Sequence, residues 1–129
     1  MIRCVRLWTA DDQNSHFEEG RIDLGAKQRG DVLSDVVSVA TLSFQETAAG
    51  GSFAWHTAPA RQLVITLSGT LNFETREGET FRISPGDILF AEDTAGGGHK
   101  WQLVDDEPWR RAYVVLQPGV SVPFVASTT

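Results

Sequence analysis

Two residue types that suit ligand or metal chemistry, a histidine and a glutamine, lie six residues apart at His56 and Gln62. Each has a neighbour that could extend a site, because Trp55 offers an aromatic face and Arg61 a charged guanidinium. An alternating apolar run follows Gln62 and ends in a Ser-Gly turn. Polar side chains held on strands keep a defined geometry, so residues 53–69 are the first place to expect a site.

Short alternating segments, separated by Gly, Pro and Asp turns, make up most of the chain around this stretch. A parallel α/β sheet needs long helical crossovers, and these turns are too short for them. The sequence therefore predicts an all-β sandwich or barrel. The segments that we expect as strands are 2–8, 16–24, 36–44, 53–56, 62–67, 70–74, 79–84, 88–91, 99–103 and 111–116.

Three of these strands carry more specific expectations. Residues 2–8 are expected at a sheet edge, and 70–74 are expected as the hairpin partner of 62–67. In the segment 36–44, alternation collects Leu42 and Phe44 on one apolar face.

Length and charge limit the number of domains and the kinds of partner that we expect. The 129 residues fit one domain, which we divide into short N-terminal strands (1–34), a motif-bearing barrel (36–116) and a C-terminal tail (117–129) that frays at its end. The formal charge is −6 and the basic residues are scattered along the chain. Both observations argue against nucleic acid as a partner, because phosphate-backbone binding needs clustered positive charge.

Several other classes lack their sequence signals. No apolar run has the length of a membrane span or a signal peptide, so we expect a soluble protein without a membrane partner. The single cysteine, Cys4, cannot form an internal disulfide, which favours a reducing compartment and hence the cytoplasm. A nucleophile elbow and a dinucleotide fingerprint are also missing from the sequence, and Cys4 has no evident base beside it.

The spacing around His56 resembles the first conserved motif of the cupins. In that motif a His-x-His pair, a Glu and a Gly occupy the positions of His56, Ala58, Gln62 and Gly69. This chain therefore has alanine in place of the second histidine and glutamine in place of the glutamate.

Residues further along the chain resemble the second conserved motif of the cupins. In it a Pro-Gly-Asp turn, here residues 85–87, leads through a strand and a loop to one more histidine, here His99. The segment 92–99, Glu-Asp-Thr-Ala-Gly-Gly-Gly-His, resembles a small bacterial cupin subgroup with a Glu-Asp-Thr-x-Gly-x-Gly-His segment. The resemblance covers roughly 36–116 and implies a jelly-roll β-barrel that holds one ligand or one metal, and often a homodimer.

Carried over residue by residue, the resemblance implies a site of His56, Gln62 and His99 for one divalent transition metal. Imidazole suits zinc, iron, nickel, manganese or copper, whereas the glutamine offers only a neutral carbonyl oxygen. An alternative is that the two histidines hydrogen-bond neighbouring backbone and that Gln62 is satisfied locally.

Further residues are candidates for ligand contact or proton transfer. Trp55, Arg61 and Trp101 are candidate ligand-binding residues, although strand alternation places Arg61 and Gln62 on opposite faces. Glu92 is the candidate acid or base, because partial burial after an apolar strand could raise the pKa of its carboxyl. Asp93 is also a candidate, but for it we favour loop solvation or a turn in which its side chain bonds to Thr94.

The sequence leaves three functions open. The first is a small cupin that binds a small organic molecule, with metal-assisted oxygenase, isomerase or lyase chemistry. The second is a metal-free binding or sensing module that uses the same residues only for hydrogen bonds. The third is a dimer with a vestigial pocket. The sequence does not decide whether the chain is an enzyme, because cupins share one fold across many functions.

Overall fold

The computed structural model describes residues 1–127, and its regular elements are all β-strands. The described chain has no helix, and so none that could cross a membrane. The strands are β1 (Arg3–Thr9), β2 (Ser15–Ile22), β3 (Ala26–Gln28), β4 (Asp31–Leu33), β5 (Val39–Thr47), β6 (Ser52–His56), β7 (Gln62–Ser68), β8 (Leu71–Thr75), β9 (Thr80–Ile83), β10 (Ile88–Glu92), β11 (His99–Leu103), β12 (Trp109–Leu116) and β13 (Phe124–Ala126).

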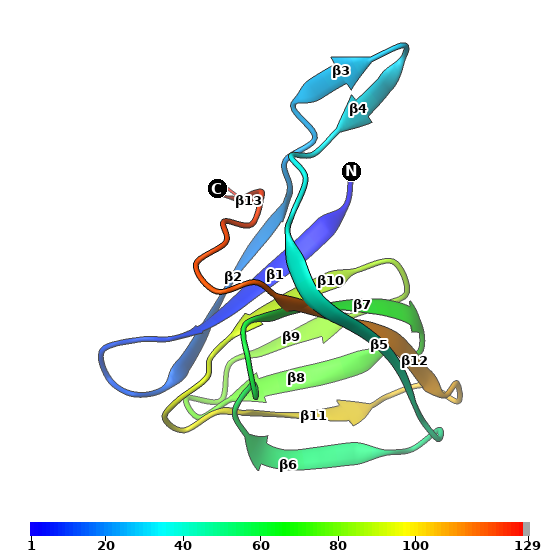
Figure 1. Ribbon diagram of the computed structural model, residues 1–129. Helices are drawn as coiled ribbons and strands as arrows, with labels where there is room; N and C mark the ends of the chain where they lie inside the picture. Colours follow the sequence, from blue (N-terminus) through cyan, green and yellow to red (C-terminus); the bar gives the residue numbers. More distant parts are fainter. Residues whose placement is uncertain (128–129) are drawn as a thin grey trace.

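Two sheets enclose the interior. The larger has the order β13-β2-β1-β10-β7-β12-β5, and the smaller has the order β6-β11-β8-β9 (Figure 1). Their order, with neighbours distant in sequence, is that of a jelly-roll barrel and confirms the all-β, cupin-type prediction. The β3-β4 hairpin stands away from the barrel (Figure 1).

The core lies where inward residues of both sheets meet. In β9, Phe81 and Ile83 are buried while Thr80 and Arg82 are exposed, as the predicted alternation requires. Strands β1, β7 and β10 contribute to the same cluster from the larger sheet, and β8 and β11 contribute from the smaller one. Side chains that are distant in the sequence therefore hold the two sheets together.

Two expectations about strand pairing are wrong. Strand β1 is not an edge, because it lies between β2 and β10 and runs parallel to β10. Strands β7 and β8 do not form a hairpin, because β7 pairs with β10 and β12 while β8 pairs with β9 and β11. Between them Gly69, at a φ of +89°, lets the chain pass from one sheet to the other.

Strand β5 differs from its prediction in position and in the role of its faces. It begins at Val39 rather than at residue 36 and forms one edge of the larger sheet. Leu42 and Phe44, on the face expected to be apolar, are 58% and 71% exposed. The opposite face carries polar side chains that line an internal cavity: Ser43, Gln45 and Thr47.

Strands β2 and β13 form more regular structure than the sequence suggests. Strand β2 is one continuous strand, and β13, from the C-terminal tail, pairs with it. Ala126 therefore lies within a strand, whereas the rest of the expected fraying, at residues 128–129, lies outside the described part of the chain. The sequence did not predict the β3-β4 hairpin, where all six residues are exposed.

A glycine before His99 holds the β10-β11 loop against β6. Gly98 has a φ of +72°, and a Cβ built on it would lie 2.1 Å from the backbone oxygen of His56. Gly78, in the β8-β9 turn, has a φ of +82° with no atom within 4 Å of such a Cβ. The two glycines thus share a backbone conformation but differ in their surroundings.

We expect Gly98→Ala to destabilise the protein more than Gly78→Ala. Both variants force alanine into the left-handed region, at about 1 kcal/mol each. Only Gly98→Ala also pushes backbone apart, which adds roughly 1–3 kcal/mol. Urea unfolding of both variants gives the comparison, and equal losses of unfolding free energy would show that the close approach to His56 is unimportant.

Candidate functional site

A cavity of about 510 Å³ lies between the two sheets. Known small-molecule sites span about 300–1,000 Å³, so the cavity has the size of a ligand pocket. Five aromatic side chains contribute to its wall: Phe53, Phe73, Trp101, Trp109 and Tyr113. Its polar groups are Ser43, Gln45, Thr47, Ser52, His56, Gln62, His99 and Arg111.

The two predicted histidines meet in this cavity. Strands β6 and β11 are antiparallel neighbours, and their register places His99 opposite His56. The ring centroids are 4.4 Å apart with the planes tilted by 60°. His99 is buried, whereas His56 is half-buried and stacks on Phe53 with centroids 4.1 Å apart.

Hydrogen bonds select the tautomer of both rings. His56 Nδ1 donates to the Ala54 carbonyl oxygen at 2.7 Å, and His99 Nδ1 donates to Asp93 Oδ2 at 2.6 Å. With the proton on Nδ1, the neutral ring keeps a lone pair on Nε2. Burial lowers the pKa of His56, and the bond to Ala54 offsets this only in part, so His56 is neutral near pH 7.

Asp93 is a buried support for His99 rather than part of a local turn. Its side chain is fully buried, and Oδ2 also accepts a hydrogen bond from Ser15 Oγ at 2.5 Å. The bond we expected to Thr94 is therefore replaced by bonds to residues of β2 and β11. Carboxylates in this position orient an imidazole and raise its basicity.

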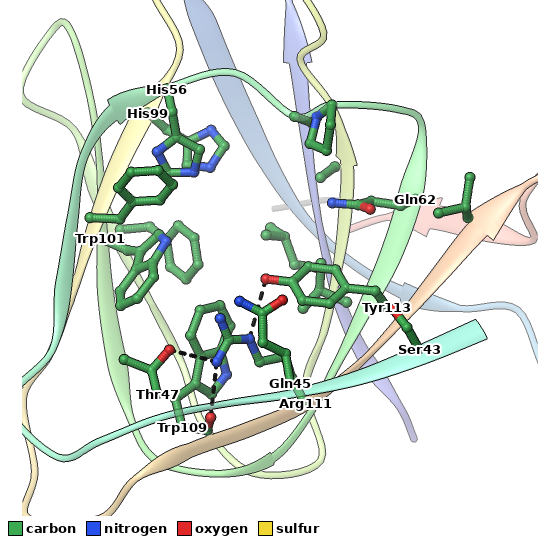
Figure 2. Close-up of a pocket in the computed structure, with 18 of the residues that line it drawn as sticks. Ser43, Gln45, Thr47, His56, Gln62, His99, Trp101, Trp109, Arg111 and Tyr113 are labelled. Carbon is green, nitrogen blue, oxygen red and sulfur yellow. Dashed lines mark hydrogen bonds between the residues drawn. The ribbon is translucent and has the colours of Figure 1, made fainter. Parts of the chain in front are cut away.

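Gln62 lines the same cavity from the other side. It is the first residue of β7 and is 6% exposed. Figure 2 shows its amide across the cavity from the two histidines. The structure thus brings the three predicted metal ligands to one cavity but sets Gln62 on a different wall from His56 and His99.

A different group of possible metal ligands lies on the surface. Asp12, His16 and Glu77 are the one place in residues 1–127 where ligand atoms of three His, Cys, Asp or Glu side chains come within 4.8 Å of one another. Asp12 and Glu77 are exposed, and His16 Nε2 donates to Asp12 Oδ2 at 2.8 Å. Exposed groups of this kind are common without an ion, and we assign no function to it.

Two of the three predicted ligand-binding residues do not line the cavity. The guanidinium carbon of Arg76 lies over the Trp55 ring, 4.0 Å from the ring centroid. The guanidinium of Arg61 binds Glu92 Oε1 at 3.1 Å through Nε. Strand alternation explains both positions, because each residue is next to an inward-facing one. Trp101, the third, does line the cavity.

Glu92 also lies outside the cavity, so its predicted role in proton transfer has no support from its position. Its carboxylate receives hydrogen bonds from Arg61 and from Arg6 Nε, the latter at 2.5 Å. Both of its oxygens are therefore bonded to guanidinium groups outside the cavity and do not face a molecule inside it. Buried His99, backed by Asp93, is the better placed group for moving a proton.

The sequence analysis missed the most unusual side chain of the cavity, Arg111. It is 2% exposed and lies over the Trp109 ring, with 3.8 Å between its guanidinium carbon and the ring centroid. Figure 2 shows its bonds to Thr47, Trp109 and Tyr113. Alternation within the predicted strand 111–116, which puts Arg111 and Tyr113 on one face, was the available signal.

Comparison with protein families matches the AraC-like ligand binding domain over residues 43–123, which carries the whole cavity wall. The chain belongs to this family. Comparison with curated proteins finds no match. The AraC-like ligand-binding domains have a cupin-type barrel, so the family agrees with the resemblance to a small cupin.

Solved structures agree with the fold of the family. A Cupin 2 conserved barrel domain protein from Salinispora arenicola is 16% identical, with a TM-score of 0.51 over 77% of this chain and 76% of that chain. The polyketide cyclase RemF from Streptomyces resistomycificus is 18% identical, with a TM-score of 0.50 over 95% of this chain and 82% of that chain. At such identities the likeness shows the fold alone.

We expect Asp93→Ala to destabilise the protein by roughly 1–3 kcal/mol, because Ser15 Oγ and His99 Nδ1 would lose a buried acceptor. The matched control is Asp106→Ala, at an exposed position, with an expected change of about 0.5 kcal/mol or less. Urea unfolding measures both. Equal stabilities of the two variants would contradict the supporting role of Asp93.

Proposed function

We propose that the barrel binds one small organic molecule in its internal cavity. The observation that carries the proposal is the combination of an aromatic wall with a few inward polar groups in a space of about 510 Å³. Trp101 and Trp109 meet edge to face with centroids 4.7 Å apart, which offers a firm apolar surface. Polar groups opposite such a surface orient a ligand and provide its specificity.

Binding without catalysis, as in a sensing module, is the function that the geometry supports best. No Asp or Glu is among the cavity-lining residues of the described chain, and Glu92 is ion-paired outside it. A barrel of this fold serves as a polyketide cyclase in RemF, so the architecture is compatible with catalysis. For a catalytic role, His99 with Asp93 behind it would act as the general base.

A test of this proposal can use the four tryptophans as reporters. Trp101 and Trp109 line the cavity, whereas Trp8 and Trp55 do not. We expect a small aromatic probe, benzamide, to shift the indole N–H signals of the first pair in an NMR titration and to leave those of the second pair in place. Equal shifts of all four signals, or none at millimolar probe, would contradict binding in the cavity.

A matched pair of variants controls this titration. Ala58→Phe places a large ring at a buried cavity position, whereas Ala54→Phe places it at an exposed position of β6. Only Ala58→Phe should weaken probe binding, because only this substitution takes volume from the cavity.

The histidine pair supports a second candidate, a metal-dependent form of the same site. Both rings carry their proton on Nδ1, so His56 and His99 fit a divalent transition metal through their Nε2 atoms. A metal bound there would act as a Lewis acid toward a ligand oxygen. We assign the Gln62 amide, on the opposite wall, to the organic ligand rather than to the metal.

Metal titration tests this candidate. We expect tag-free protein carrying His16→Ala, which removes a ligand of the surface group, to take up one equivalent of zinc or another divalent transition metal. Adding His56→Ala or His99→Ala should weaken uptake by more than about tenfold. No uptake, or uptake that both further substitutions leave unchanged, would contradict a metal at the histidine pair.

The homodimer and the cytoplasmic location stay predictions. A dimer is supported by strand β5, a sheet edge whose outer face exposes Leu42 and Phe44. The location is supported by Cys4, whose thiol is free and buried, with burial raising its pKa to about 12.

A further inference from the structure

The cavity wall contains one permanently charged side chain, Arg111. Arginine stays charged in proteins, and this one is buried with 2% of its surface exposed. Among the described residues that line the cavity there is no Asp or Glu. Within residues 1–127, no carboxylate oxygen lies within 4.0 Å of a guanidinium nitrogen of Arg111. A buried charge without a counter-charge is strongly unfavourable, so its presence in a cavity needs an explanation.

The hydrogen bonds of Arg111 position the guanidinium but do not neutralise it. Nη1 donates to Thr47 Oγ1 at 2.8 Å and to the Trp109 carbonyl oxygen at 3.0 Å, and Nε donates to Tyr113 Oη at 3.2 Å. All three acceptors are neutral. Together with the Trp109 ring beneath it, they hold the planar group in one orientation.

The remaining nitrogen of Arg111 is directed to the cavity. Nη2 makes no hydrogen bond to the part of the chain that the structure describes. Within residues 1–127, Asp93 Oδ1 is the only side-chain nitrogen or oxygen that is fully enclosed by protein and makes no hydrogen bond. Because Nη2 makes no hydrogen bond either, it is not fully enclosed by protein. Its two N–H groups are therefore available to a molecule in the cavity.

The other residues that line the cavity indicate the shape and polarity of a ligand that would fit it. Arg111 lies at one end of the cavity, and the pair of His56 and His99 lies at the other (Figure 2). Trp101 lies between them and meets Trp109, the ring under the guanidinium, edge to face to form an apolar wall. A ligand that fills this space has an anionic group at one end and a flat apolar body.

We infer that the cavity binds a small organic acid with a flat apolar body, and that its carboxylate pairs with Arg111. The inference rests on the proposed ligand-binding function and names its ligand class. A carboxylate supplies the missing negative charge and accepts from the free Nη2, with the planar geometry that guanidinium favours. Tyr113 Oη, beside the guanidinium, can donate its own proton to the same carboxylate.

Benzoate and benzamide test the inference in the unmodified protein, because they differ mainly in charge. We expect benzoate to bind at least about tenfold more tightly, the usual gain from a charge-assisted hydrogen bond. The NMR titration that follows Trp101 and Trp109 gives both dissociation constants. The Nε–H signal of Arg111 should shift with benzoate and not with benzamide.

A charge-matched pair of variants assigns the preference to one residue. Arg111→Gln should remove the preference for benzoate, and Arg111→Lys should keep part of it because it retains the charge without the fork. Arg110→Gln removes the same charge from the neighbouring, exposed position and should keep the full preference. If Arg111→Gln fails to fold, the shift of the Arg111 Nε–H signal with benzoate in the unmodified protein assigns the preference, and a preference without that shift overturns the inference.

The outcomes separate the inference from the proposed function. Equal binding of benzoate and benzamide overturns the inference and leaves cavity binding in place. A preference that persists in Arg111→Gln also overturns it, since the carboxylate would then bind elsewhere. If neither probe moves the signals of Trp101 and Trp109, the proposed function and the inference both fail.

Discussion

The inner faces of the two sheets pack against each other over only part of their area. The cavity and its polar lining depend on this incomplete packing. Where side chains such as Leu71 and Ile83 meet Val5, the interior is a closely packed core. Elsewhere the sheets leave about 510 Å³ open. Polar residues can face inward there because the open space lets a ligand or water satisfy them.

Strands from outside the family segment help to complete the site. Ser15 lies in β2, before the matched residues 43–123, yet its hydroxyl binds the carboxylate that orients His99. The carboxylate itself follows β10, which pairs with the N-terminal strand β1. The N-terminal strands thus support the site through hydrogen bonding as well as by extending the larger sheet.

The cavity has different chemistry at its two ends. His56 and His99 offer imidazole rings at one end, and Arg111 offers a fixed positive charge at the other. Aromatic residues of the wall lie along the space that separates the two ends. An elongated, polar-ended molecule suits this arrangement better than a compact, uniformly polar one.

Alternation and turn residues are local signals, so the sequence was enough to predict most of the strands and the barrel. It also placed His56, Gln62 and His99 on or at the ends of strands, and these three residues line one cavity. Which face of each strand looks inward depends on the tertiary packing. In β5 the inward face is polar, and in β12 it carries Arg111, since both strands border open space rather than packed core, and alternation alone cannot distinguish the two. The hydrogen bond from Arg111 to Thr47 also depends on the tertiary structure, because it joins residues 64 positions apart.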